Sequence, residues 1–171
     1  MDTDVVERCR EPDYRFAATA RRSALPALAR YGLRGDSLDE AELMISELVT
    51  NALQHGACPI AVLVWSCAPD CVVVEVHDTD PDIPALPAPR SLSEVDMLDA
   101  AGRGLPLVTR LSQRCCGVEA LPLHGKSVWF GLALTSDASV PRSALAPRIR
   151  ARIHARHGSG HRGRLAGPRL L

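Results

Sequence analysis

The ten residues Glu47-Leu-Val-Thr-Asn-Ala-Leu-Gln-His-Gly56 form the most informative stretch of this sequence. Polar residues recur every fourth position, at Glu47, Asn51 and His55, so they lie along one side of a helix with 3.6 residues per turn. Apolar residues on the other side predict a buried face. A solvated polar face is the simplest interpretation. However, Asn is a poor helix former, so a mid-helix Asn one turn after a Glu suggests a function.

The residues around this stretch predict an alternation of helices and strands. The helix that carries Glu47 is expected over 37–55, and Gly56 ends it. Two apolar runs, 60–67 and 71–78, flank a three-residue loop and predict a β-hairpin. The other expected elements are a short strand at 13–17, helices at about 20–31 and 105–114, and strands at 118–122 and 127–134.

The charges are distributed unevenly along the 171 residues, although the formal net charge is zero. All 20 acidic residues lie at or before Asp137, and only twelve basic residues accompany them, so residues 1–137 carry −8. Eight arginines and no acid follow. The sequence therefore predicts an acidic body with a basic tail that could touch nucleic acid or anionic lipid, with a solvated tail or one folded onto the acidic body as the alternative.

Six cysteines are present, and none forms a Cys-x-x-Cys pair. A zinc site from Cys67, Cys71 and His77 is conceivable, but its spacing matches no common zinc pattern. We therefore expect reduced cysteines in a cytoplasmic protein. No apolar run approaches the roughly 20 residues that a membrane span needs.

Four separate segments together suggest a nucleotide site. A helix carries Glu47 and Asn51, a strand ends in Asp78, a proline-rich loop leads to Gly102-x-Gly104 at a helix start, and a last strand begins at Gly125-Lys-Ser127. Amides at a helix N-terminus can receive phosphates. A carboxylate can accept the amino hydrogens of adenine, and an Asn oxygen is a suitable ligand for Mg²⁺.

In these segments the chain resembles the Bergerat-fold (GHKL) ATPases, which include gyrase and the histidine kinases. More narrowly, it resembles the small, single-domain anti-sigma-factor serine/threonine kinases of actinobacterial type. The resemblance covers about residues 13–135. The matching motifs are Ser-Glu-Leu-Val-Thr-Asn-Ala-x-x-His-Gly (46–56), Val-Glu-Val-x-Asp (74–78), Gly-Arg-Gly-Leu-x-Leu-Val (102–108) and Gly-Lys-Ser-Val-Trp-Phe (125–130).

The resemblance implies roles for individual residues. Glu47 would be the general base, Asn51 would ligate Mg²⁺, and Asp78 would bind the adenine amino group. Ser127 would support Asp78 and a water at the adenine, and residues 79–101 would form the ATP lid. The residues expected at the nucleotide are Asn51, His55, Asp78, Gly102, Arg103, Gly104, Leu105 and Ser127.

The adenine motif departs from the family pattern Asp-x-Gly-x-Gly, because this chain has Asp80 and Asp82 where that pattern has glycine. The side chains keep the backbone farther from a nucleotide. Two added carboxylates would also repel a triphosphate unless Mg²⁺ or arginines compensate. This departure bears on nucleotide affinity and leaves the fold unaffected.

The elements and the resemblance together predict an α/β (α+β) two-layer sandwich, with a mixed, mostly antiparallel sheet and helices on one face. The expected domains are a flexible N-terminus (1–12), a histidine-kinase-like ATPase domain (13–136) and an Arg-rich, disordered tail (137–171).

The resemblance also implies a function and its partners. The protein would bind ATP and Mg²⁺, sequester a sigma factor and phosphorylate an anti-anti-sigma (antagonist) protein. A homodimer is a further expectation, and nucleic acid is expected as a partner only through the basic tail. The alternative is a non-catalytic protein-binding module of the same fold, with weak or no nucleotide binding.

Overall fold

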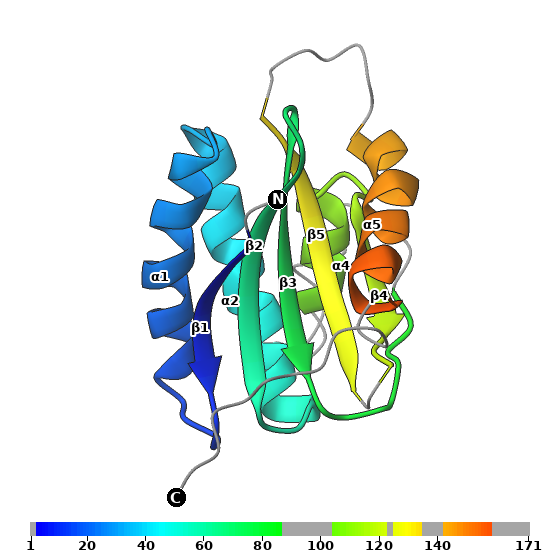
Figure 1. Ribbon diagram of the computed structural model, residues 1–171. Coiled ribbons are helices and arrows are strands. Elements are labelled where there is room, and N and C mark those ends of the chain that lie inside the picture. The colour runs from blue at the N-terminus through cyan, green and yellow to red at the C-terminus, as the bar shows by residue number, and fades with distance from the viewer. Residues whose placement is uncertain (1–2, 87–103, 123–124, 135–141, 159–171) are drawn as a thin grey trace, which may run out of the picture.

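The computed structural model of this protein describes residues 3–86, 104–122, 125–134 and 142–158 (Figure 1). The elements follow one another in the order β1 (Thr3–Cys9), α1 (Phe16–Arg30), α2 (Asp36–His55), β2 (Ile60–Ala68), β3 (Cys71–Asp78), α4 (Gly104–Leu111), β4 (Cys116–Ala120), β5 (Lys126–Ala133), the 3₁₀ helix η2 (Arg142–Leu145) and α5 (Ala146–Gly158).

The strands form one sheet in the order β1-β2-β3-β5-β4. Every neighbouring pair of described strands is antiparallel, so the sheet is antiparallel throughout and not mixed. The α/β sandwich is confirmed, and so is the hairpin, since β2 and β3 pair across a short turn. Its second strand has the bounds that the sequence predicts.

The larger core lies between one face of the sheet and the helices α1, α2 and α4 (Figure 1). Val72, Val74 and Val76 of β3 belong to it, because alternate residues of a strand face the same side. α2 contributes the apolar side that its spacing predicts, Ala41, Ile45, Leu48, Val49 and Ala52, and Met44 is buried with them. The polar side of α2 therefore borders this core, near the ends of the central strands.

A second core lies on the opposite face of the sheet, beneath α5 (Figure 1). Leu145, Ile149 and Ile153 recur every fourth residue and are buried in one cluster with Trp65 and Trp129. The prediction that residues 137–171 are disordered is therefore wrong for residues 142–158. The helices also cover both faces of the sheet, and not one.

The physical reason for this error is that α5 has little to bury on its own. Its apolar side chains Ile149 and Ile153, and Leu145 of η2 just before it, are surrounded in the sequence by alanines and arginines, so the local pattern is weak. The signal lay in the strands instead. β2, β3 and β5 are apolar on both faces, and such strands need a cover on each side.

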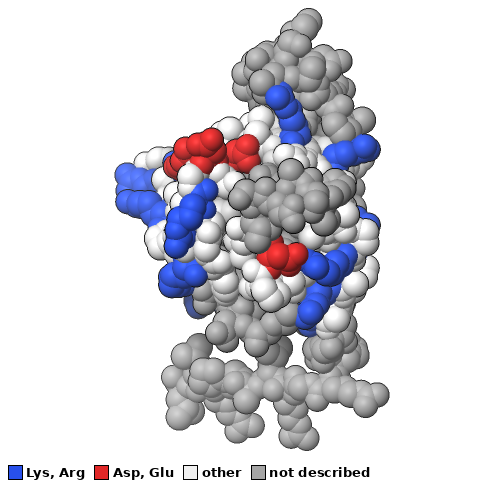
Figure 2. Space-filling model, turned by 90° about the horizontal axis from the view of Figure 1, so that it is seen from above, with Lys and Arg blue, Asp and Glu red and all other residues white. Residues whose placement is uncertain are grey.

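Charged residues of α5 pair with acidic residues of the β2–β3 turn and of β4. Arg148 lies 2.9 Å from Asp70, and Arg150 lies 2.6 Å from Glu119. The basic segment thus folds onto the acidic body, which was one of the two alternatives for it. On the face shown in Figure 2, basic and acidic side chains of the described residues are interspersed.

A buried carboxylate, Glu75 of β3, lies beneath the last turn of α5. Its neighbours His77 and His157 lie 2.8 Å and 3.3 Å from its Oε2 atom. Burial by itself would raise the pKa of Glu75, but the hydrogen bonds from His157 and His77 outweigh it and hold this pKa well below its ordinary value. The carboxylate is therefore ionised in the folded protein.

The N-terminal prediction is also wrong. Residues 3–9 form the edge strand β1 and are not a flexible segment, whereas residues 13–17 lead into α1 and are not a strand. β1 pairs with β2 along most of its length, with one irregularity between Val5 and Glu7. The charged residues of β1 led to the prediction of a loose terminus, although charged residues are common on edge strands.

Of the helices that the structure describes, none combines the length and the apolar character required to cross a membrane.

Candidate functional site

A polar cavity of about 240 Å³ opens where α2 and β3 end and β5 begins. Its lining residues are Asn51, His55, Asp80, Asp82, Ile83, Pro84 and Lys126. Asn51 and His55 come from the polar side of α2, the two aspartates follow β3, and Lys126 begins β5. The cavity therefore joins three of the four segments that the sequence analysis singles out.

Glu47, on α2, lies beside Gly104 at the start of α4, which is the segment that ends the expected lid. A Cβ atom at Gly104 would lie 3.0 Å from Glu47 Oε2, so the missing side chain of Gly104 lets the two elements approach. The carboxyl group is partly buried, and this desolvation raises the pKa of Glu47 above its ordinary value of 4.5. A carboxylate with a raised pKa is a better proton acceptor.

Asp78 is held by Lys126, which itself lines the cavity. Lys126 Nζ lies 3.0 Å from Asp78 Oδ1 and 2.8 Å from Asp80 Oδ2, and it also donates to the Asp80 carbonyl. Asp78 and Lys126 are only 2% and 4% exposed. A buried carboxylate and a buried ammonium group thus form an ion pair at the position where an adenine is expected.

The ion pairs change the charge balance of the cavity. Burial disfavours the charged amine, but the hydrogen bonds to Asp80 and Asp78 outweigh it and raise the pKa of Lys126. The same hydrogen bond from Lys126 lowers the pKa of Asp80. Lys126 therefore supplies a compensating cation for one of the two extra carboxylates, that of Asp80, and this cation is a lysine and not the expected arginine or Mg²⁺.

Asp78 is enclosed from the other side as well. A Cβ atom at Gly56 would lie 2.8 Å from Asp78 Oδ2, and the backbone amide of Asp80 donates to Asp78 Oδ1 at 2.9 Å. An adenine amino group that bonds to Oδ1 would compete with both Lys126 and this amide. The expected adenine contact of Asp78 thus requires Lys126 to move or to share its acceptor.

Ser127 does not support Asp78, and this expectation is wrong. In the antiparallel register Asp78 is opposite Lys126, and His77 is opposite Ser127. The Ser127 hydroxyl donates to Glu75 Oε2 at 2.8 Å, on the face covered by α5. The reason is the two-residue period of a strand, because neighbouring residues point to opposite faces.

The remaining predicted residues fall into two groups. Gly104 and Leu105 begin α4, and both are partly buried. Gly102, Arg103 and residues 87–101 of the expected lid lie outside the described residues. The described part of that loop, residues 79–86, has no helix or strand and supplies Asp80, Asp82, Ile83 and Pro84 to the cavity.

Lys126 is the site residue that sequence reasoning missed. It is the only lysine of the chain, and it directly precedes the serine that was chosen. That this is the chain's one lysine could have indicated from the sequence that Lys126 is a site residue. The choice between two adjacent residues, however, depends on the pairing register of β5 with β3, which no local pattern supplies.

The oxygen donors at the cavity suit a hydrated magnesium ion, since a carboxamide and carboxylates are hard oxygen ligands. Asn51, Asp80 and Asp82 offer these groups. The start of α4 beside Glu47 offers backbone amides to phosphates. A cavity beside the polar side of α2, with the start of a second helix near Glu47, is an arrangement suited to a nucleotide in an α/β domain.

The chain belongs to the family of histidine kinase-like ATPase domains. The family's model matches residues 11–130, which is most of the chain. The match includes α1, α2, α4 and most of the sheet, and therefore the whole described cavity. β1 and α5 lie outside it. No curated protein matches the chain.

Proposed function

We propose that the protein is an ATP-dependent regulatory protein serine/threonine kinase of the anti-sigma-factor type. The observation that carries this proposal is the position of Glu47, which has a raised pKa, contacts the start of α4 and lies one helical turn before Asn51 at the cavity. A general base beside a phosphate-binding helix start is the arrangement that phosphoryl transfer to a hydroxyl requires.

In this proposal each residue has one task. Asn51 holds Mg²⁺, which neutralises phosphate charge when bound. The amides at the start of α4 orient the phosphates, and Glu47 accepts the proton of a serine or threonine hydroxyl on an anti-anti-sigma protein. The protein sequesters a sigma factor in the cytoplasm. Phosphorylation of the antagonist prevents it from displacing the sigma factor, so the sigma factor stays bound to this protein.

Phosphotransfer from radiolabelled ATP to candidate antagonist proteins tests this proposal. Glu47→Gln should lower the rate by at least about a hundredfold, which is the usual contribution of a general base. The matched control is Glu42→Gln, because Glu42 lies on the same helix but is exposed and pairs with Arg21. Equal rates for Glu47→Gln and wild type would remove the catalytic role of Glu47.

The pH profile adds a second test of the same role. Glu47 must be ionised to accept a proton, so the rate should fall as the pH decreases through a pKa above 4.5. The Glu42→Gln protein should keep this profile, and the Glu47→Gln protein should lose it. A wild-type rate that is flat over this range would contradict the assignment.

The ion pair between Lys126 and Asp78 favours a second candidate function, a non-catalytic module that binds a partner protein and holds ATP weakly or not at all. Here Lys126 closes the adenine position permanently. Calorimetry with ATP and Mg²⁺ separates the two candidates. Micromolar affinity in wild type that is lost in Asn51→Ala supports the kinase, whereas no measurable binding in either protein supports the module.

A further inference from the structure

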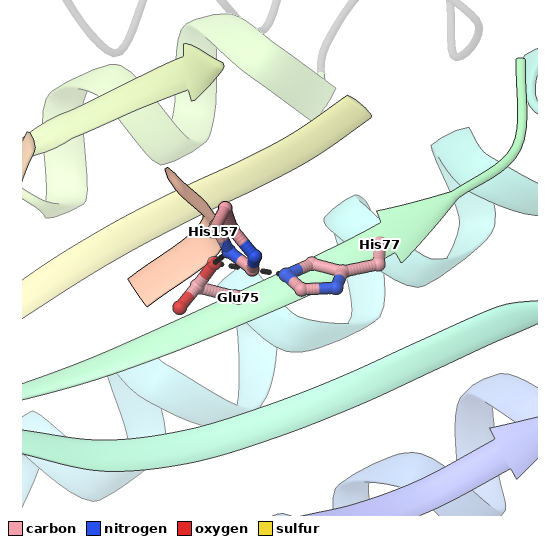
Figure 3. A group of neighbouring side chains, drawn as sticks. All are labelled: Glu75, His77 and His157. Atoms are coloured by element: carbon pink, nitrogen blue, oxygen red, sulfur yellow. Dashed lines mark hydrogen bonds and ion pairs between the residues drawn. The ribbon is translucent and has the colours of Figure 1, made fainter. Parts of the chain in front are cut away.

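Glu75, His77 and His157 bring three metal-ligating groups together on the α5 face of the sheet (Figure 3). Glu75 and His77 are two residues apart on β3, so both point to this face, and His157 comes from the last turn of α5. One donor atom from each residue lies within 4.8 Å of the other two. The cluster is separate from the cavity with Asn51, because that cavity lies on the other face of β3.

The distances are close to those of a metal site. His77 Nε2 and His157 Nε2 lie 2.8 Å and 3.3 Å from the same atom, Glu75 Oε2. Ligands 2.0–2.1 Å from a tetrahedral zinc ion are separated from one another by about 3.3 Å. The separation of His157 from Glu75 already matches this value, whereas the His77 ring would have to move outward by about half an ångström; the two imidazole nitrogens lie within 4.8 Å of each other.

The surroundings hold the carboxylate in a fixed orientation. Trp65 Nε1 donates to Glu75 Oε1 at 2.6 Å, and Ser127 Oγ donates to Oε2 at 2.8 Å. Hydrogen bonds of this kind orient the ligands of metal sites and tune their affinity. Arg156 stacks over the Trp65 ring and lies 3.4 Å from Oε1, so its charge is on the carboxylate oxygen that faces away from the imidazoles.

Solvent can reach the cluster from the imidazole side. The Glu75 side chain is 0% exposed, whereas the side chains of His77 and His157 are 16% and 22% exposed. An ion can therefore enter past the two rings, and a water molecule can complete a four-coordinate shell. Two imidazoles with one carboxylate favour a transition metal over Mg²⁺ or Ca²⁺, which prefer oxygen ligands.

We propose that Glu75, His77 and His157 bind a divalent transition-metal ion of the zinc class, which fastens the last turn of α5 to β3. This site is independent of the proposed kinase function, since none of its residues lines the nucleotide cavity. The ion replaces the contacts of the two rings with the carboxylate and links β3 to α5.

Isothermal titration of the untagged, chelator-treated full chain with zinc chloride tests the proposal. Wild type should bind one tight equivalent, and His77→Ala and His157→Gln should each bind more than about tenfold more weakly. The glutamine keeps a hydrogen-bond donor for Glu75 but is a poor ligand. The control is His154→Ala, because His154 lies on the same helix and contacts Glu119 instead, at 2.7 Å.

Cobalt(II) provides a readout that does not depend on any variant folding. One equivalent added to wild type should give the intense visible absorption of a four-coordinate ion, and an equivalent of zinc should abolish it. Zinc should also slow amide hydrogen exchange in residues 146–158. No tight zinc equivalent in wild type, equal affinity in His157→Gln, or a cobalt spectrum of a hydrated ion would overturn the proposal and leave a hydrogen-bonded carboxylate.

Discussion

The two faces of the sheet are covered in different ways. The face toward α1, α2 and α4 has a large apolar core, and its polar residues collect at one end around the candidate nucleotide cavity. The face toward α5 has a smaller core with both tryptophans of the chain, and buried charge lies inside it at Glu75. One face thus depends mainly on helix packing, and the other combines three apolar anchors with ion pairs.

The family match follows this division. It ends at residue 130, within β5, so it includes the first face and omits the helix that covers the second. The matched part of the chain therefore includes the helices of the first face, and the helix that covers the second face lies beyond it. The comparison teaches that the two faces of one sheet can be covered by different means, a layer of helices on one and a single docked helix on the other.

Removing α5 should have the largest effect on this comparison. A chain that stops at residue 141 loses the buried side chains of Leu145, Ile149 and Ile153, and the free energy of unfolding should fall by about 5 kcal/mol. Urea unfolding followed by circular dichroism measures the loss, and tryptophan fluorescence should shift to the red. A chain that stops at residue 158 is the control and should match wild type; equal stability of the shorter chain would show that the second face needs no cover.

Breaking the ion pair between Lys126 and Asp78 should lower the free energy of unfolding by somewhat less than the removal of α5 does. Lys126→Met leaves the buried Asp78 carboxylate without its cation, and such a change destabilises by about 3 kcal/mol. Asp78→Asn in the same chain should recover much of this loss. Thermal and urea unfolding of the two single variants and the double variant measure the coupling; additive effects would mean that the pair contributes nothing by itself.

The two tryptophans allow a matched test inside the second face. Trp65 Nε1 donates to Glu75, whereas the buried Trp129 Nε1 has no hydrogen-bond partner among the described residues. Trp65→Phe should therefore cost about 2 kcal/mol more than Trp129→Phe, because a hydrogen bond to a charged group is lost. Urea unfolding by circular dichroism measures both, and equal losses would assign the stability of this face to packing alone.

The surface ion pair of α5 should have the smallest effect. Arg148 and Asp70 are both substantially exposed, so Arg148→Ala should change the free energy of unfolding by less than about 0.5 kcal/mol. Asp70→Asn removes the other charge of the pair and should change the free energy of unfolding by a similarly small amount. A loss above 2 kcal/mol in both proteins would show that α5 is held by its arginines as much as by its apolar anchors.

Much of the first face could be predicted from the sequence because its signals are local. The four-residue spacing of Glu47, Asn51 and His55 predicts one side of a helix, and the structure places all three on α2. The hairpin turn and apolar runs predict β2 and β3 with nearly correct bounds. These features follow from chain geometry within a few residues.

The errors arise where distant segments meet. β1 was missed because its charged residues resemble a loose terminus, and only its pairing with β2 makes it a strand. α5 was missed because Ile149 and Ile153, with Leu145 of η2, form a buried cluster only against Trp65 and Trp129. Both elements owe their stability to partners far away in the chain.

The sequence by itself determined the order of helices and strands from α1 to β5, the polar side of α2 and the likeness to a family of ATPase domains, since each depends on local spacing and on motifs. Only the tertiary structure decided that Lys126, and not Ser127, faces Asp78, and that Glu75, His77 and His157 converge beneath α5. The physical reason is that strand register and helix docking depend on long-range contacts, and a shift of one residue moves a side chain to the other face of the sheet.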